Sequence, residues 1–160
     1  ISGVGAGIYE VTVTDQANCS GVEVIEIPAV QPDAQQICLV TVDDASATNK
    51  IVWEKPAVQG GIESYNIYRE TSQFGTFQLL GNVLYTDESE YTDVTANPAV
   101  QAYRYKVSVV DTCGNESNVS LHHKTIHLSL SSFAGDNFLN WSSYEGFTYT
   151  SFNIWKYSFK

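Results

Sequence analysis

The sequence is poor in basic residues, proline and cysteine, and it contains no methionine. Its 18 acidic residues outnumber 8 basic ones, giving a formal net charge of -10. This excess repels phosphate backbones and anionic lipid, so nucleic-acid and membrane-surface binding are not expected. No apolar run approaches the roughly 20 residues that cross a bilayer, so no membrane insertion is expected either. Helix formers are sparse and aromatic residues reach 12 %, a composition that favours an all-β protein.

Motifs for catalysis and for metal binding are also missing. The sequence has no G-x-S-x-G, no H-E-x-x-H and no Cys–His pair that the topology places together, so we predict no enzyme and no cofactor. His122 and His123 are neighbours on an expected strand and point to opposite faces. His123 and His127 share a face but lie about 13 Å apart along an extended chain, too far to share one ion. We interpret all three as exposed polar positions.

Carboxylates gather in two stretches, at 43–44 and at 87–93, the second including Asp93. Calcium prefers several oxygens converging from one turn, but neither stretch has the D-x-[DN]-x-[DN]-G spacing of a known calcium loop. We expect solvated acidic loops and no metal site.

The chain begins at Ile1 without an initiator methionine or a signal peptide, and we interpret it as an internal piece of a longer protein. Three cysteines, few charges and many Ser, Thr and Asn residues are typical of an exported protein, although an odd number of cysteines cannot pair completely.

The stretch 102–111, AYRYKVSVVD, alternates apolar and polar residues and predicts a central strand with Tyr103, Tyr105 and Val107 on its apolar face. Short strands separated by turn signals surround it, which is the pattern of a β-sandwich. Trp53, Tyr65 and Ile67 are expected to face the core. Seven strands are predicted, at 37–42, 50–54, 63–70, 76–80, 90–94, 102–111 and 118–125.

The segments on either side indicate incomplete neighbouring domains. Residues 1–30 contain two alternating stretches followed by a proline-containing linker, and we interpret them as the last strands of a preceding domain. Residues 126–160 repeat the start of the central domain: Trp141 lies 88 residues after Trp53, and FNIWK at 152–156 matches YNIYR at 65–69. A repeat of this length indicates an array of domains. We therefore expect 126–160 to supply three strands of a second copy, with Trp141 in its core.

Trp53, YNIYR at 65–69 and YRYKVSVVDTCGNES at 103–117 together resemble bacterial fibronectin type III domains. Residues 1–27, with Cys19, resemble the end of an Ig/PKD-like repeat. The resemblance implies an all-β chain of tandem antiparallel β-sandwiches, with one complete domain at 31–125 and a partial one on each side. The succession is similar to large adhesin-like proteins of gliding bacteria exported by the type IX route, which implies an extracellular, cell-surface location.

The same resemblance implies roles for particular residues. Tyr103 matches the tyrosine corner of the family, whose ring lies in the core while its hydroxyl binds a backbone group near the turn. Cys38 opens the first strand and Cys113 follows the central strand, at the same end of the fold, so a disulfide between them is expected. Two separate thiols are the alternative. Cys19 would pair outside this chain.

A non-catalytic structural or adhesion segment, a semi-rigid stalk, is the favoured function. Its expected partners are neighbouring domains of the same polypeptide, with surface glycans or other cell-surface proteins as further candidates. The alternative is a glycan-binding accessory module of a secreted polysaccharide-degrading enzyme. Tyr68 and Trp155 occupy equivalent outward positions in the two copies and are candidate sugar contacts, unless they only pack across neighbouring strands.

Overall fold

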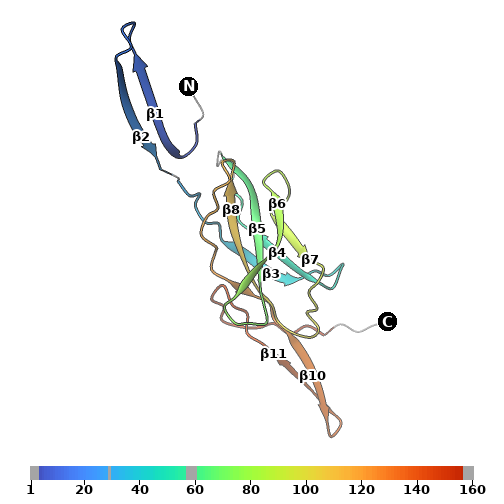
Figure 1. Ribbon diagram of the computed structural model, residues 1–160. Coiled ribbons are helices and arrows are strands. Elements are labelled where there is room, and N and C mark those ends of the chain that lie inside the picture. The colour runs from blue at the N-terminus through green and yellow to red at the C-terminus, as the bar shows by residue number, and fades with distance from the viewer. Residues whose placement is uncertain (1–3, 29, 57–60, 157–160) are drawn as a thin grey trace.

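The computed structural model describes residues 4–28, 30–56 and 61–156 of the chain. Within this part it contains strands and turns but no helix, which confirms the all-β class (Figure 1). The strands are β1 (Gly7–Thr14), β2 (Ser20–Ile27), β3 (Ile37–Val42), β4 (Asn49–Trp53), β5 (Ile62–Glu70), β6 (Phe77–Leu84), β7 (Glu90–Asp93), β8 (Arg104–Asp111), β9 (His123–Lys124), β10 (Leu128–Phe133) and β11 (Asp136–Trp141).

Strands β3 to β9 form two antiparallel sheets that pack face to face into a β-sandwich, called the sandwich below. One sheet has the order β3-β4-β7 and the other the order β6-β5-β8-β9. The predicted central strand becomes β8, which lies between β5 and β9. Consecutive side chains of a strand point to opposite faces, so each strand sends alternate residues inward.

Five of the predicted core residues are buried at 1 % exposure or less: Trp53, Tyr65, Ile67, Tyr105 and Val107. The rings of Trp53 and Tyr65 lie 5.3 Å apart across the two sheets. Burial of each large apolar side chain contributes about 1.5–3 kcal/mol, so this cluster supplies much of the driving force for folding. The alternation that predicted these positions is the one that the backbone adopts.

Tyr103 differs from its predicted position, because it is half-buried rather than fully enclosed in the core. It precedes β8, where the sandwich ends, and its ring packs 6.5 Å from that of Tyr105. Its hydroxyl accepts a hydrogen bond of 3.0 Å from the Asn97 backbone N–H. The tyrosine-corner contact therefore forms at the rim of the core.

Asp93, expected in a solvated loop, is instead buried at the end of β7. Its carboxylate accepts hydrogen bonds from Arg69 at 2.7 Å, Tyr105 at 2.9 Å and Thr95 at 2.7 Å. Burial alone would raise the pKa of Asp93, but the hydrogen bonds from Thr95, Arg69 and Tyr105 outweigh it and lower that pKa. A buried carboxylate persists here because every donor around it is directed at the charge.

The last strand of the sandwich, β9, is much shorter than the predicted strand 118–125, with only His123–Lys124 in regular pairing. Before it, serine hydroxyls take the place of backbone carbonyls. Val109 N–H donates to Ser117 Oγ at 2.9 Å, and Val107 N–H donates to Ser120 Oγ at 3.0 Å. The edge of β8 is thus satisfied without a continuous strand.

Two hairpins extend from opposite ends of the sandwich (Figure 1). At one end, β1 and β2 pair over their full length and expose most of their side chains. At the other end, β10 and β11 form a second two-stranded sheet. Trp141, predicted in a core, is 38 % exposed because no second sheet covers its face within the described residues. Residues 152–156, predicted as a third strand, are not in a strand.

Candidate functional site

After β11 the chain turns back and packs against the sandwich in the gap between β3 and β9. Residues 142–149 make this contact and are called the clamp segment below. Within it, Glu145 forms an isolated antiparallel bridge with Lys124 of β9. Tyr144 is 8 % exposed and belongs to the core cluster of the sandwich. A residue 104 positions away in sequence therefore closes the edge next to Val40.

The hydroxyl of Tyr144 joins the two sheets. It accepts a hydrogen bond of 3.0 Å from the backbone N–H of Val40 in β3 and lies 2.8 Å from Nδ1 of His123 in β9. Since β3 is the outer strand of its sheet, the Val40 N–H has no strand partner on that side. The tyrosine oxygen supplies the acceptor that a neighbouring strand would otherwise provide.

Glu145 forms the charged half of the clamp segment. Arg104 donates to its carboxylate through Nε at 2.7 Å and Nη2 at 3.0 Å, a bidentate pair. Lys124 Nζ also donates to it, and His122 Nε2 lies 2.8 Å from Oε2. These contacts, led by the hydrogen bond from Arg104, hold the pKa of Glu145 far below its usual range. Arg104 binds Glu70 as well, at 2.8 Å.

Gly146 completes the clamp segment by letting the backbone approach the ring of His123. A Cβ atom at this position would lie 2.3 Å from His123 Cγ, far inside contact distance. The residue also has φ +134°, a conformation that side chains rarely adopt. Only glycine therefore fits, and His123 is enclosed by Gly146 and by the rings of Tyr144 and Phe147.

His123 is the buried histidine of this site, at 5 % exposure, and not the exposed polar residue that the sequence suggested. Burial lowers its pKa, and the neighbouring His122 lowers it further. The neutral ring is thus the form that the packing favours. The sequence around His123 did not indicate that its ring would be buried, because the residues that cover the ring, such as Tyr144, follow 20 or more positions later in the chain.

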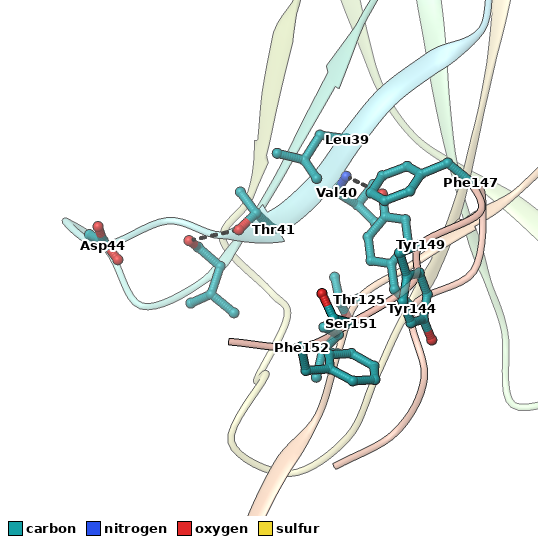
Figure 2. Close-up of a pocket in the computed structure, with 12 residues that line it drawn as sticks. Leu39, Val40, Thr41, Asp44, Thr125, Tyr144, Phe147, Tyr149, Ser151 and Phe152 are labelled. Atoms are coloured by element: carbon teal, nitrogen blue, oxygen red, sulfur yellow. Dashed lines mark hydrogen bonds between the residues drawn. The ribbon is translucent and has the colours of Figure 1, made fainter. Parts of the chain in front are cut away.

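An apolar groove of about 470 Å³ continues the gap beyond Tyr144. Figure 2 shows aromatic side chains of the C-terminal region on one side of it and side chains of β3 on the other. The lining residues are Leu39, Val40, Thr41, Val42, Asp44, Thr125, Ile126, Tyr144, Phe147, Tyr149, Ser151 and Phe152. The groove offers apolar surface together with the outer backbone edge of β3.

The predicted disulfide is not formed, because Cys38 and Cys113 are separate, exposed thiols, as is Cys19. The pairing of β3 with β4 shifts register between Ile37 and Leu39, which leaves Cys38 at a bulge. Ile37 and Val40 take the inward positions and Cys38 faces solvent. Cys113 lies in a turn in which its own N–H donates to Asp111 Oδ1 at 2.9 Å.

The two candidate sugar contacts have different surroundings. Tyr68 is half-buried, and its hydroxyl donates to Glu116 at 2.5 Å on the outer face of the sheet. Glu116 also accepts from Asn66 and Ser108, so the tyrosine belongs to a hydrogen-bonded network across the strands. Trp155 is 76 % exposed. Of these two candidate sugar contacts, only Trp155 therefore presents a free aromatic ring.

Within residues 4–28, 30–56 and 61–156, no group of three or more His, Cys, Asp or Glu side chains is placed to hold a metal ion. The described part of the chain also contains no helix that is long and apolar enough to cross a membrane.

No family model matches the chain, and no curated protein sequence does. Solved structures give weak likenesses. An Fn3-like protein from Clostridium thermocellum matches with 22 % identity and a TM-score of 0.47, over 60 % of this chain and 93 % of that one. Domains A168–A170 of titin match with 21 % identity and a TM-score of 0.48, over 75 % of this chain and 39 % of theirs.

A beta-1,2-glucanase from Parabacteroides distasonis matches with 24 % identity and a TM-score of 0.44. That match covers 64 % of this chain and only 15 % of the glucanase. The fold assignment accordingly depends on the strand order β3-β4-β7 and β6-β5-β8-β9.

Proposed function

We propose that this chain is a non-catalytic structural segment of a cell-surface protein, in which β-sandwich units follow one another as a semi-rigid stalk. The observation that carries the proposal is the equivalence of two hairpins, β3–β4 within the sandwich and β10–β11 after it. If the second hairpin begins another sandwich, the chain contains a junction between successive units. A structural array is the simplest use of such a junction.

The two hairpins have corresponding cross-strand pairs, apart from the bulge at Cys38 that only β3 contains. In β3–β4 the pairs on the Trp53 side of the sheet are Ile37↔Trp53, Val40↔Ile51 and, at the exposed end of β3, Val42↔Asn49. In β10–β11 the corresponding pairs are Leu128↔Trp141, Leu130↔Leu139 and Ser132↔Asn137. Tryptophan, an aliphatic pair and asparagine thus recur in the same order along one face.

The aromatic partner of the tryptophan recurs as well. Trp53 packs on Tyr65 with 5.3 Å between ring centroids, and Trp141 packs on Phe152 with 5.5 Å. The two tryptophans differ in how far other side chains cover them, since Trp53 is 1 % exposed and Trp141 is 38 % exposed. In the sandwich that cover is provided by β5 and β8. The second hairpin therefore has the inner face of a sandwich, and a sheet of the β5–β8 kind is the partner that it fits.

Composition supports an extracellular location for such an array, since Ser, Thr and Asn are abundant and charged residues make up only 16 % of the chain. The expected partners are the neighbouring domains of the same polypeptide. Export by the type IX route and a place in an adhesin of gliding bacteria remain part of the proposal that only the sequence resemblance supports.

Quenching of tryptophan fluorescence by iodide tests the array. In the 160-residue chain Trp141 is accessible, so W53F, which keeps Trp141, is expected to be strongly quenched. In a longer form that extends through one more repeat of the natural protein, Trp141 is expected to become as protected as Trp53. Equal quenching of Trp141 in the two forms would contradict the array. Trp155 is replaced by Phe throughout as a control.

Glycan binding is a second candidate, favoured by the exposed ring of Trp155. A depression of about 260 Å³ adjoins this ring and is lined by apolar residues of the β10–β11 region. A ring face of this kind can stack on a pyranose. Saturable binding on a glycan array that W155A abolishes and Y68F leaves intact would favour this candidate over a purely structural role.

A further inference from the structure

The clamp segment joins two regions that sequence periodicity separates. It lies between β11 and residues 152–156, which places it inside the second unit by the 88-residue repeat. Yet Tyr144 packs in the core of the first unit and Glu145 pairs with β8 and β9. Residues 142–149 therefore bind one unit while they connect two strands of the next.

We propose that the clamp segment is a releasable contact that fixes the β10–β11 hairpin against the sandwich, and that mild acid releases it. Its importance for a stalk depends on the proposed function, but the contact and its release are properties of this chain alone. In the clamped state the junction is rigid. In the released state the connection between the sandwich and the β10–β11 hairpin bends, and the Val40 N–H at the outer edge of β3 loses its acceptor.

Release is a local event because the anchors are few. Among residues 142–149, Tyr144 alone is fully buried and Tyr149 packs partly buried against the core, whereas Ser143, Phe147 and Thr148 are exposed. A segment held by two aromatic side chains, only one of them fully buried, and by a partly exposed ionic cluster opens more readily than the core strands. The sandwich can therefore stay folded while the clamp segment opens.

The hydrogen bonds of Tyr144 explain the dependence on acid. Its oxygen already accepts the Val40 N–H, so its own proton is free to be donated to His123 Nδ1 when that nitrogen is unprotonated. Protonation of Nδ1 turns it into a second donor facing the same oxygen. It also places a charge in an enclosure of aromatic rings and glycine, where no carboxylate contacts His123 among the described residues.

Protonation of His123 and protonation of Glu145 both favour release of the clamp segment. The pKa of His123 is lowered in the clamped state by burial and by His122, so the released state binds the proton more tightly and release is favoured as pH falls below about 6.5. The pKa of Glu145 is lowered by Arg104 and the other donors, so its stabilisation is lost as pH falls below about 4.3.

Other charged groups around the clamp segment act on the same equilibrium. Arg104 and Lys124 both pair with Glu145, and Glu70 shares Arg104 with Glu145. His122 Nε2 also contacts the Glu145 carboxylate. The Cys38 thiol lies near Tyr144 and has no charge in acid. Of these groups, His123 is the one that contacts Tyr144 directly and whose protonation the clamped packing disfavours.

Amide hydrogen exchange of Val40 in the full chain tests this inference, because the Tyr144 hydroxyl is the acceptor of that N–H. Protection factors, corrected for the intrinsic pH dependence of exchange, are measured at pH 7.5 and 5.5, with Ile67 in the core as internal reference. We expect Val40 to lose up to about tenfold protection at pH 5.5, the effect of one pH unit below a pKa, while Ile67 keeps its protection.

Three variants make the result decisive. Y144F is expected to remove Val40 protection at both pH values, and G146A to do the same by pushing the backbone away from His123. H127Q, which changes a histidine outside the clamp segment, is expected to behave like the natural chain. Unchanged Val40 protection in both Y144F and G146A would overturn the clamp. A parallel change of Val40 and Ile67 with pH, or no change of either, would overturn release by acid. None of these outcomes depends on whether Trp141 becomes covered in a longer protein.

Discussion

Trp53 and Trp141 hold matching positions in two hairpins but have different surroundings, since one is buried between sheets and the other is partly exposed. Replacing a buried tryptophan by alanine removes contacts and leaves a cavity, at a cost of about 3–5 kcal/mol. We expect W53A to lose this much unfolding free energy and W141A to lose less than about 1.5 kcal/mol. Urea unfolding followed by circular dichroism measures both, and equal losses would mean that the face of Trp141 is covered.

The buried carboxylate of Asp93 predicts how stability depends on pH. Its pKa is lowered in the folded state by hydrogen bonds that outweigh burial. The stabilisation is therefore present above about pH 3.9, the unfolded value, and is lost as pH falls through the folded value. We expect D93N to cost about 2–3 kcal/mol at pH 7, and its stability to fall less than that of the natural chain between pH 5 and 3.

Urea midpoints at several pH values measure this effect. Asp136→Asn serves as the matched control, because Asp136 is exposed at the tip of the β10–β11 hairpin. A D93N protein whose pH dependence follows that of the natural chain would contradict the assignment of the effect to Asp93.

Some residues of the sandwich core could be predicted from the sequence, and others could not. Alternation identified Trp53, Tyr65, Tyr105 and the rest of the central core, because a half-buried strand requires it. It could not identify Tyr144 or the burial of His123, since both depend on a loop that packs against another part of the chain. The predicted cysteine pair is also absent: Cys38 follows the inward Ile37 and faces solvent, and Cys113 is a separate exposed thiol.

At the level of elements, most strands of the sandwich lie within a few residues of their predicted bounds. β3 has the bounds expected, and β4, β5, β7 and β8 differ by two residues or fewer at either end. β6 extends four residues beyond its predicted end, and the last strand is much shorter than predicted. Ser117 and Ser120, before and within the predicted last strand, look like ordinary polar positions, but their hydroxyls replace ladder acceptors and let the backbone depart from the strand.

The hairpin β1–β2 is an element without a core of its own. Its apolar side chains are largely exposed, among them Ile8 at 73 % and Val13 at 69 %. An isolated two-stranded hairpin is marginal in water. We expect deletion of residues 1–30 to change the unfolding free energy of the sandwich by less than about 0.5 kcal/mol, as measured by urea unfolding. A loss of several kcal/mol would reveal packing between the hairpin and the sandwich.

At the level of the whole molecule, the net charge of -10 governs long-range encounters. We expect the protein to flow through a heparin column at low salt and to show no sedimentation with anionic vesicles, because both partners carry the same sign of charge. Retention on an anion exchanger under the same conditions is the positive control. Salt-sensitive retention on heparin would contradict the expectation and indicate a local basic surface.

The contact of Tyr144 with Val40 and His123 also determines where this protein can be cut. The sequence repeat suggests a boundary after Thr125, but a fragment that stops there loses the phenol that fills the edge of its own fold. Expression fragments of this protein should therefore run through Tyr149, although that residue belongs by periodicity to the next copy. In an array built in this way, the units defined by the sequence repeat and the units that pack together overlap by about two dozen residues.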